Sequence, residues 1–538
     1  MRVGIAQINT RVGDLAGNAG RIIAAARAAE AGGAAIVLFP ELCVTGYPPR
    51  DLLLDDAFVD AAVAATNQIA QALAGSVPVI VGTVLRAPER PPRHPGLYNA
   101  LAVLAGGRVV ASRKKRILPV YDVFHEPRWF VPGPAEPPLA LAGEKAGFCI
   151  CEDLWSEAYA IDPPRDLRAA GAGILLCASA SPYRAGVLEK RLHHARRAGG
   201  PLVFVNAVGA NDELIFDGGS FVVSSSGEIL ASLPRFEEAV AVIDTDESPE
   251  SPAPPAPFAP FVEELFRALV LGVRDFALKN NTRRAFLGLS GGIDSALVAC
   301  IAAEALGPSA VTALALPSRH TDPRSTSSAR ELAASLGIGF EETPIEPLHR
   351  SFEETLAPLL AGAPEGDTTA ENIQARLRAV VLMAYVNRRG GVLLNTSNKT
   401  EITLGYGTLY GDMAGTLSVL GDLTKTEVYA VARFLHKERG LIPAFILDRP
   451  PSAELRPGQV DPFDYDKAAP LAEALIQREA GGGGSLDGAP DEIARFRRLI
   501  HGAEHKRWQA GIVLKVSERA FGSGRMMPVT AAPPKKPS

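Results

Sequence analysis

The sequence predicts an α/β protein with two domains. Short β-like runs alternate with alanine-rich helical stretches through most of the chain, and a proline-rich break divides this alternation into two blocks. With 538 residues, the chain is too long for one ordinary domain. We therefore expect one domain over residues 1–246, an extended linker over 247–260, a second domain over 261–530 and a disordered tail over 531–538.

The first block predicts a layered α/β domain. Its β-like runs are partly separated by alanine-rich helical stretches such as residues 21–31. The runs are residues 3–8, 36–39, 77–84, 100–104, 147–150, 173–176 and 202–205.

The second block predicts an open parallel sheet. Residues 248–255 read Ser-Pro-Glu-Ser-Pro-Ala-Pro-Pro, which cannot sustain a helix or a central strand. Beyond them, strands are expected near residues 285–289, 311–316 and 392–395, with the ligand at their carboxyl edge. Three further stretches are predicted to be mobile, namely residues 87–96, 481–485 and 531–538.

The composition favours small-molecule substrates. Lysine and arginine total 55 against 60 aspartate and glutamate residues, a net charge of −5, which favours neither a nucleic-acid partner nor a membrane surface. No apolar stretch approaches the length of a membrane span, and the first residues read as a strand rather than a signal peptide. The cysteines are sparse and lie mostly in apolar runs: Cys43, Cys149, Cys151, Cys177 and Cys300. Free thiols in a reducing cytoplasm are the expected state.

The most informative segment follows the strand expected at 285–289. Two glycines let the backbone approach a ligand, unpaired N–H groups point outward before a helix expected from Ala296 onward, and serine hydroxyls add donors. Such a loop binds phosphate or pyrophosphate, and the missing Lys-Ser/Thr ending of a Walker loop disfavours an NTPase. The segment comprises Gly288, Leu289, Ser290, Gly291, Gly292, Ile293, Asp294 and Ser295.

A rival interpretation of the same segment is a hydrolase. Gly288, Ser290 and Gly292 also satisfy the pattern G-x-S-x-G of a nucleophile elbow. Ser290 would then require a later aspartate and histidine, for which Asp412 and His436 are the candidates. A further alternative is a metabolite sensor that binds nucleotide without turnover.

Three residues at predicted strand ends form a second group. Glu41 follows the run 36–40, Lys115 precedes Arg-Ile-Leu-Pro, and Cys151 opens Cys-Glu-Asp-Leu-Trp. These runs resemble the nitrilase-type amidohydrolase family, whose triad is Glu, Lys and Cys. The resemblance implies an α-β-β-α sandwich in which Cys151 attacks an amide, Glu41 carries the proton and Lys115 stabilises the oxyanion. The nearby cation is expected to lower the thiol pKa.

The spacing of Cys149 and Cys151 leaves one alternative use of the thiols. Alternation along a strand would put both on one face, where they could bind a metal. A single Cys-x-Cys without partner histidines or cysteines is a weak metal signal.

Motifs in the second block resemble a second family. The phosphate loop is similar to that of ATP pyrophosphatases, which cleave ATP between the α and β phosphates. The resemblance to the NAD synthetase family rests on the order and spacing of residues 371–376 (Glu-Asn-Ile-Gln-Ala-Arg), 395–401 (Asn-Thr-Ser-Asn-Lys-Thr-Glu), 411–412 (Gly-Asp) and 423–425 (Leu-Thr-Lys). It implies a doubly wound, parallel-sheet domain that binds adenine nucleotide, with Mg²⁺ as cofactor and ATP as co-substrate.

The same resemblance implies roles for individual residues. ATP is assigned the segment 288–295, Thr396 and Lys425. The acid dinucleotide, deamido-NAD, is assigned Asn372, Arg376, Glu401, Asp412 and Lys506. Magnesium is assigned Asp294 and Glu401.

Segments 121–126 and 178–183 resemble the glutaminase domains of this family. They imply Tyr121, Phe124 and Ser181 as glutamine-binding residues. The chain departs from the family at His125, where the family carries Asp, and at Val187, where it carries Lys or Arg. The candidates for holding the glutamine carboxylate are therefore Arg184, Lys190 and Arg191.

Together the two resemblances imply a reaction and cover residues 1 to about 530. ATP would activate deamido-NAD as an acyl adenylate, and ammonia from glutamine would displace AMP to give NAD. Ammonia is mostly protonated near neutral pH, so an internal tunnel is expected between the two sites. The enzyme is expected to have at least two subunits. The alternative is another glutamine-dependent adenylating ligase with the same loop.

Overall fold

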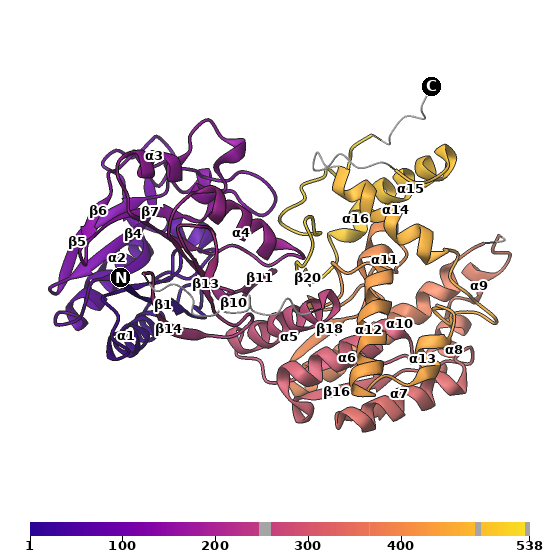
Figure 1. Cartoon of the computed structure of the whole chain (residues 1–538). Helices are drawn as coiled ribbons and strands as arrows, with labels where there is room; N and C mark the ends of the chain where they lie inside the picture. The colour runs from indigo at the N-terminus through magenta and orange to yellow at the C-terminus, as the bar shows by residue number, and fades with distance from the viewer. Residues whose placement is uncertain (247–259, 365, 479–485, 533–538) are drawn as a thin grey trace. The chain divides into compact units, whose positions relative to one another are not determined.

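The computed structural model describes residues 1–246, 260–364, 366–478 and 486–532. The chain divides into two compact units, Met1–Ala259 and Pro260–Ser538 (Figure 1). The predicted linker apart from its last residue, the glycine-rich stretch 481–485 and most of the tail lie outside the described residues. Among the helices that the structure describes, none has both the length and the hydropathy needed to cross a bilayer.

The first unit contains two six-stranded sheets and a separate hairpin. One sheet has the order β14-β1-β2-β3-β4-β5, and the other has the order β13-β12-β9-β8-β7-β6. The strands of the first sheet are β1 (Arg2–Gln7), β2 (Ile36–Leu38), β3 (Val79–Arg86), β4 (Leu97–Ala105), β5 (Arg108–Lys114) and β14 (Ala239–Asp244). Those of the second are β6 (Leu139–Leu141), β7 (Glu144–Ile150), β8 (Ile174–Ser179), β9 (Leu202–Asn206), β12 (Phe221–Val223) and β13 (Ile229–Ser232), and the hairpin is β10 (Val208–Asn211) with β11 (Leu214–Asp217).

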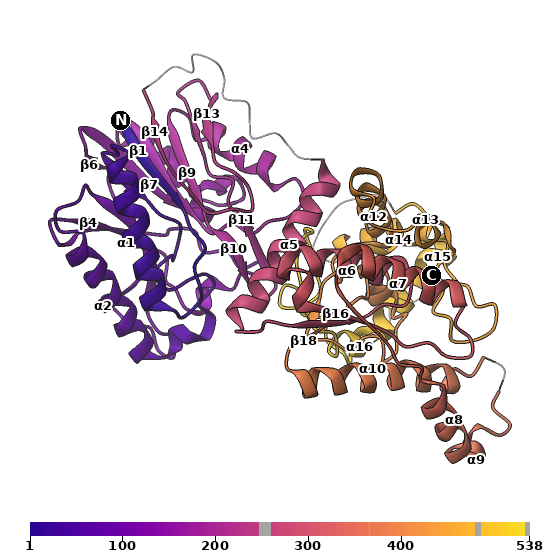
Figure 2. The same cartoon turned by 90° about the horizontal axis from the view of Figure 1, so that it is seen from below.

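Helices cover the outer faces of both sheets, as Figure 2 shows for α1, α2 and α4. The helices are α1 (Leu15–Ala31), α2 (Asp56–Ala72), α3 (Pro163–Ala169) and α4 (Val187–Arg197), and the short 3₁₀ turns are η1 (Arg50–Leu54), η2 (Glu126–Arg128), η3 (Cys151–Leu154) and η4 (Ser156–Ala158). One apolar cluster joins α1 and α2 to the first sheet, a second fills the space between the sheets, and a third joins α3 and α4 to the second sheet. The layer order is α-β-β-α, as predicted.

The burial of strand β8 explains why the central strands of the first unit appear in the sequence as continuous apolar runs. All its residues are buried, because one face meets helices and the other meets the first sheet. Leu175 and Cys177 belong to the helix-side cluster, whereas Ile174, Leu176 and Ala178 belong to the cluster between the sheets. Burial on both faces removes the polar alternation that a half-exposed strand would show.

The second unit contains one parallel sheet of six strands. Its order is β17-β16-β15-β18-β19-β20, so the chain order reverses between β15 and β18. In open α/β sheets, ligands bind outside the carboxyl ends of the strands at such a reversal. The strands are β15 (Ala285–Gly288), β16 (Val311–Ala315), β17 (Gly339–Glu342), β18 (Val392–Asn395), β19 (Leu417–Ser418) and β20 (Ile512–Val513).

Helices lie on both sides of this sheet, with α6 and α7 on one side and α10 on the other in Figure 2. Helix α10 packs Leu382 and Tyr385 against Phe286 and Leu393 of the strands. The helical elements are α5 (Phe261–Lys279), α6 (Ile293–Leu306), η5 (Pro308–Ala310), α7 (Pro323–Leu336), α8 (Glu346–Thr355), α9 (Ala357–Leu360), α10 (Thr369–Arg389), α11 (Lys399–Leu404), α12 (Lys425–Arg439), α13 (Ala444–Asp448), α14 (Tyr465–Arg478), α15 (Pro490–Gly502) and α16 (Glu504–Arg507). The doubly wound parallel fold matches the prediction.

A buried ion pair ties α4 to the hairpin strand β11 in the first unit. Arg191 Nη1 lies 2.8 Å from Asp217 Oδ1, and both side chains are fully buried. Arg235 Nε donates to the other carboxylate oxygen of Asp217 at 3.0 Å. The carboxylate therefore compensates two guanidinium groups that have little access to water.

Replacing Asp217 with alanine is expected to destabilise the first unit. The change leaves the Arg191 charge buried without its carboxylate, which should lower the free energy of unfolding by about 3–5 kcal/mol. A urea titration of the full chain measures the effect. Asp60→Ala, which removes one of the two exposed partners of Arg86, is the control and should change stability little. Equal effects of the two substitutions would contradict the prediction.

Candidate active sites

The first candidate site lies where three strands of the first unit end. Glu41 comes shortly after β2, Lys115 directly after β5 and Cys151 directly after β7. Lys115 Nζ lies 2.8 Å from Glu41 Oε1, and both side chains are almost completely buried. The charges of both residues act on the buried Cys151 thiol. The fold thus brings together the three residues that the sequence analysis selected.

The Glu41 carboxylate is held on both oxygens. Asn99 Nδ2 donates to Oε1 at 2.7 Å, alongside Lys115, and the backbone N–H of Ala180 donates to Oε2 at 3.0 Å. These bonds fix the orientation of the carboxylate.

A second buried carboxylate, Glu126, is a part of this site that the sequence analysis missed. Lys115 Nζ donates to Glu126 Oε1 at 2.8 Å, and Tyr47 donates its hydroxyl hydrogen to the same oxygen at 3.1 Å. Burial raises the pKa of Glu126 to about 7, against the opposing charge of Lys115. Glu126 stands at the end of the segment 121–126, but a glutamate at the start of a short turn carries no local sign of burial. Only the tertiary fold reveals it.

The backbone turns sharply at Cys151. This residue has a φ of +43°, because β7 ends at Ile150 and the 3₁₀ turn η3 begins at Cys151. Cys149 therefore belongs to the helix-side cluster of the second sheet, whereas Cys151 belongs to the cluster between the sheets. The predicted common face of the two cysteines is wrong, and they do not form a metal-binding pair.

The pKa of the Cys151 thiol differs from the expectation. Burial raises it well above the usual range, the Glu41 charge raises it further, and Lys115 and a hydrogen bond with Ser179 only partly offset this. Lys115 does lower the thiol pKa, as predicted, but burial and the Glu41 charge outweigh it. A thiol whose pKa is raised in this way needs a base when it reacts.

Tyr121 and Phe124 lie together beside this site. Their rings meet edge to face with centroids 5.4 Å apart, and the Tyr121 hydroxyl donates to Glu152 Oε2 at 3.0 Å. Tyr121 is about half exposed, at 48%. Ser181 is buried on the loop after β8, where its hydroxyl accepts a hydrogen bond from Arg191 Nε at 3.2 Å.

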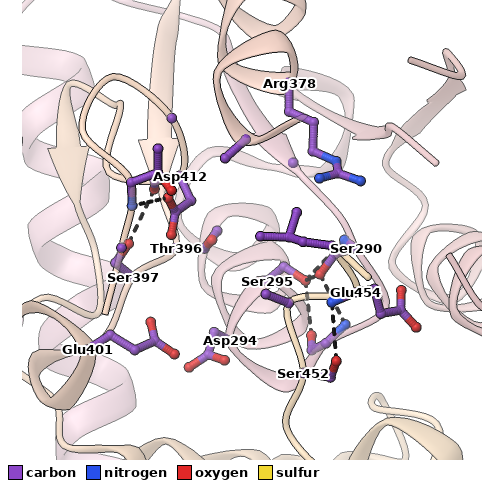
Figure 3. A pocket seen from close by; sticks show the side chains of 18 of the residues that line it. Ser290, Asp294, Ser295, Arg378, Thr396, Ser397, Glu401, Asp412, Ser452 and Glu454 are labelled. Carbon is purple, nitrogen blue, oxygen red and sulfur yellow. Dashed lines mark hydrogen bonds between the residues drawn. The ribbon is translucent and has the colours of Figure 1, made fainter. Parts of the chain in front are cut away.

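The second candidate site is a cavity of about 460 Å³ in the second unit. It lies at the carboxyl ends of β15, β16 and β18, where the order of the sheet reverses. Every residue of the predicted phosphate loop except Gly291 lines it, and Figure 3 shows Ser290, Asp294 and Ser295 along one wall. The cavity thus lies at the carboxyl edge, where the ligand is predicted to bind.

The geometry of the loop requires glycine at position 291. Gly291 has a φ of +77°, and a Cβ atom there would lie 2.3 Å from the carbonyl oxygen of Ser325, so only glycine fits. Gly292 occupies the N-cap position of α6, which begins at Ile293 rather than at the predicted Ala296. The first N–H groups of α6 consequently belong to the loop itself, where an anion can accept from them.

The hydroxyl groups in the loop do not form a hydrolase site. Ser290 Oγ lies 3.3 Å from Ser295 Oγ, which in turn donates to the carbonyl oxygen of Gly292 at 2.9 Å. The Nδ1 atom of His436 is 2.6 Å from the carbonyl oxygen of Ile442. Within the described part of the chain, no histidine lines the cavity. The nucleophile-elbow alternative therefore lacks its base.

Two carboxylates converge on one point beside the loop. Asp294 and Glu401 point toward each other in Figure 3, and Lys425 Nζ lies 2.6 Å from Asp294 Oδ2 and 3.3 Å from Glu401 Oε1. Burial and the Asp294 carboxylate raise the pKa of Glu401 to about 8, against the opposing effect of Lys425. A cation is needed between these oxygens, and carboxylate oxygens are ligands that Mg²⁺ accepts. The two carboxylates therefore fit a magnesium ion, and Lys425 Nζ balances their charge in this structure.

Comparisons with known proteins match both units. The profile of the carbon-nitrogen hydrolase family matches residues 2–250, and that of the NAD synthase family matches residues 265–510. A protein of Synechocystis sp. named glutamine-dependent NAD(+) synthetase is 40% identical, over 98% of each chain. The chain belongs to the glutamine-dependent NAD(+) synthetase family. These proteins are carbon-nitrogen ligases.

Two further members of the glutamine-dependent NAD(+) synthetase family support this assignment. The protein of that name from Rhodobacter capsulatus is 39% identical, over 98% of each chain. A solved structure of the Acinetobacter baumannii enzyme, in complex with ADP, is 32% identical and superposes with a TM-score of 0.76 over 98% of each chain. The two-domain fold is therefore that of the family.

The cavity of this NAD(+) synthetase family member brings together most of the residues that are predicted to bind deamido-NAD. Asn372 Oδ1 accepts from the Thr408 hydroxyl at 2.6 Å, and Lys506 Nζ donates to the carbonyl oxygens of Gly405 and Gly407, each at 2.8 Å. Glu401 and Asp412, which are also predicted to bind the dinucleotide, line the cavity as well. So do Thr396 and Lys425, which are predicted to bind ATP.

Arg376 is the exception among these predicted residues. It is exposed, its Nε donates to the carbonyl oxygen of Leu409 at 3.1 Å, and it is absent from the lining of the cavity. Arg378, which the sequence analysis did not select, points into the cavity in Figure 3 while its Nε donates to the carbonyl oxygen of Leu316 at 3.0 Å. Burial lowers the pKa of Arg378 to about 10. The role predicted for Arg376 stays a prediction.

Proposed function

We propose that the protein makes NAD from deamido-NAD, ATP and the amide nitrogen of glutamine. The observation that carries this proposal is the presence, in one chain, of a buried Glu41–Lys115–Cys151 group and a phosphate loop beside paired carboxylates. The name of the Synechocystis relative, which is 40% identical over nearly its whole length, supports it. In this proposal, one unit produces ammonia and the other consumes it.

Cys151 attacks the side-chain amide of glutamine in the first step. Its neutral thiol passes the proton to Glu41 as the sulfur bonds to the amide carbon, and Lys115 stabilises the negative oxygen that forms. The carbon–nitrogen bond then breaks, and ammonia leaves with the proton from Glu41. Water next attacks the thioester while Glu41 takes its proton, which releases glutamate and restores the thiol.

The second unit activates the acid group of deamido-NAD. The acid oxygen attacks the α-phosphorus of ATP, and the bond from that phosphorus to the β-phosphate oxygen breaks, so pyrophosphate remains in the loop 290–295. Ammonia then attacks the acyl carbon, and AMP leaves. Asp294 and Glu401 would hold Mg²⁺, which when bound neutralises phosphate charge. Lys425, freed from these carboxylates, would contact the phosphates.

We propose further that ammonia passes between the sites inside the protein. The support is chemical: protonated ammonium is not a nucleophile, and release into neutral water would convert most of the ammonia to that form. We also propose that this path is enclosed and that the protein is a homo-oligomer in the cytoplasm. Loss of all glutamine-derived ammonia to solvent during NAD synthesis would contradict the enclosed path.

The products of ATP consumption test the proposed reaction directly. Purified protein supplied with glutamine, ATP and deamido-NAD should form NAD, AMP and pyrophosphate in equal amounts, because the loop retains pyrophosphate as the leaving group. Chromatography of the nucleotides and a pyrophosphate assay measure this. Formation of ADP and orthophosphate would contradict it.

The same assay addresses the alternative of another adenylating ligase. ATP cleavage should depend on deamido-NAD and should not occur with other acids that ligases of this type activate. Pyrophosphate release with another acid, and none with deamido-NAD, would favour the alternative.

A further inference from the structure

Two neighbouring histidines on α4 face a glutamate on the turn η4. His193 Nε2 lies 3.3 Å from Glu157 Oε1, and His194 Nδ1 lies 3.9 Å from Glu157 Oε2. Taking one nitrogen or oxygen atom from each residue, the three atoms lie within 4.8 Å of one another. None of the three residues has a role in the proposed reaction. Two imidazoles and a carboxylate at this spacing are a ligand set for a metal ion.

The two histidines converge because they use different ring nitrogens. Residues adjacent in a helix do not normally face each other, and helical metal-binding histidines are usually spaced four residues apart. Here the ring centroids lie 5.2 Å apart. The far nitrogen of His193, Nε2, and the near nitrogen of His194, Nδ1, both lie near the Glu157 carboxylate. The pair therefore forms one site without showing the usual sequence spacing.

His194 Nδ1 is a buried polar atom that lacks a hydrogen-bond partner. The His194 side chain is only 10% exposed, and its ring packs against Trp155 with the centroids 4.3 Å apart. Among the described residues, none makes a hydrogen bond with Nδ1, since Glu157 at 3.9 Å is too distant. Burial lowers the pKa of His194, which favours the neutral ring that a metal ion requires. A metal ion between His194 and Glu157 would satisfy this nitrogen.

The separations fit a tetrahedral ion after a small movement. With metal–ligand distances of about 2.1 Å, tetrahedral ligand atoms lie about 3.4 Å from one another. The separation of 3.3 Å already matches, and that of 3.9 Å must shorten. The side chains of His193 and Glu157 are 64% and 45% exposed, so both can adjust while His194 stays in place. Three protein ligands leave the fourth position of the ion to water.

The surroundings favour zinc over magnesium. Arg197 Nε lies 3.1 Å from Glu157 Oε1 and can hold this carboxylate as an outer partner, while its Nη2 pairs with Asp162 at 2.9 Å. The charges of Arg197 and Lys190 both act on His194, so net charge at the site does not attract a hard cation. Imidazole nitrogen suits Zn²⁺, whereas Mg²⁺ takes oxygen ligands. Affinity must therefore come from the two histidines.

We propose that Glu157, His193 and His194 bind a zinc ion that links α4 to the turn η4. This turn closely follows η3, which begins at the candidate nucleophile Cys151. With three protein ligands and one open position, the site should exchange its metal, unlike closed structural sites with four protein ligands. The inference concerns metal binding and does not depend on the proposed reaction.

Zinc titration of the full-length protein in excess Mg²⁺ tests this inference. His193→Ala and Glu157→Gln should each weaken binding of one zinc equivalent by about 100-fold or more, because even the loss of an outer partner of a metal ligand costs about 10- to 100-fold. Both side chains are largely exposed, so neither substitution should affect folding, which circular dichroism checks. His505→Ala is the control, since this exposed histidine belongs to no such group in the described part of the chain, and it should bind zinc like the wild type.

Cobalt provides a second measurement that depends on the ligands themselves. Tetrahedral Co²⁺ absorbs visible light far more strongly than the hydrated octahedral ion, so the wild type should show absorption bands that His193→Ala and Glu157→Gln lack. Zinc should also raise the unfolding temperature of the wild type more than that of either variant, because the ion binds only the folded site. Equal zinc binding by the wild type and both variants would overturn the inference. Cobalt bands that persist unchanged in both variants would overturn it as well.

Discussion

Cys151→Ala should abolish glutamine-dependent NAD synthesis while leaving synthesis from ammonium chloride intact. Without the sulfur, no covalent bond to the amide carbon can form, and we expect glutaminase activity to fall on the order of 10,000-fold or more. The phosphate loop and the Asp294–Glu401 pair belong to the other unit and are unchanged. Parallel assays of NAD formation with glutamine and with ammonium chloride measure the separation.

Cys149→Ala provides a matched control for this substitution. Cys149 lies two residues earlier and is also buried, but it packs in the cluster below the helices rather than beside Lys115 and Glu41. Its replacement should cost some stability through the small cavity it leaves, and it should retain glutaminase activity. A glutaminase that survives Cys151→Ala, or that is lost equally in Cys149→Ala, would contradict the assignment of the nucleophile.

Asp294→Asn should impair NAD synthesis with either nitrogen source. The carboxylate and its partner Glu401 converge on one cation position, so the neutral amide weakens the site for Mg²⁺ and removes charge from the loop. Loss of one preorganised electrostatic element of this kind typically lowers kcat roughly 100- to 1,000-fold. The measurement is NAD formation with ammonium chloride over a range of Mg²⁺ concentrations, in which the variant should need more magnesium.

Glu304→Gln is the control on the same helix. Both residues lie on α6, but the Glu304 side chain is half exposed and pairs only weakly with Arg439 at 3.4 Å. This variant should match the wild type in activity and in magnesium dependence. A normal magnesium response in Asp294→Asn would count against the metal assignment, and a normal rate would count against any role of Asp294 in phosphate activation.

Local patterns in the sequence predicted two α/β units, whereas the α-β-β-α order of the first came from the family resemblance. The alternation of apolar runs and alanine-rich helices predicted two α/β units, and the strands at 285–288, 311–315 and 392–395 were found within one residue of their observed ends. Strands β17, β19 and β20 were missed because they are short, and β17 is largely exposed. Two- to four-residue strands bury too little apolar surface to produce a recognisable periodicity.

The sequence by itself determined the chemical types at both sites: a glutamate, a lysine and a cysteine at strand ends, and a glycine-serine loop before a helix. These follow from residue identity and spacing, which act over a few neighbouring positions. Pairings across long separations were decided only by the tertiary structure. Glu126 forms an ion pair with Lys115, and Lys425 contacts both Asp294 and Glu401, because the strand ends of each sheet converge. Burial raises the pKa of the Cys151 thiol, although the neighbouring Lys115 lowers it, and this burial arises only when the sheets pack.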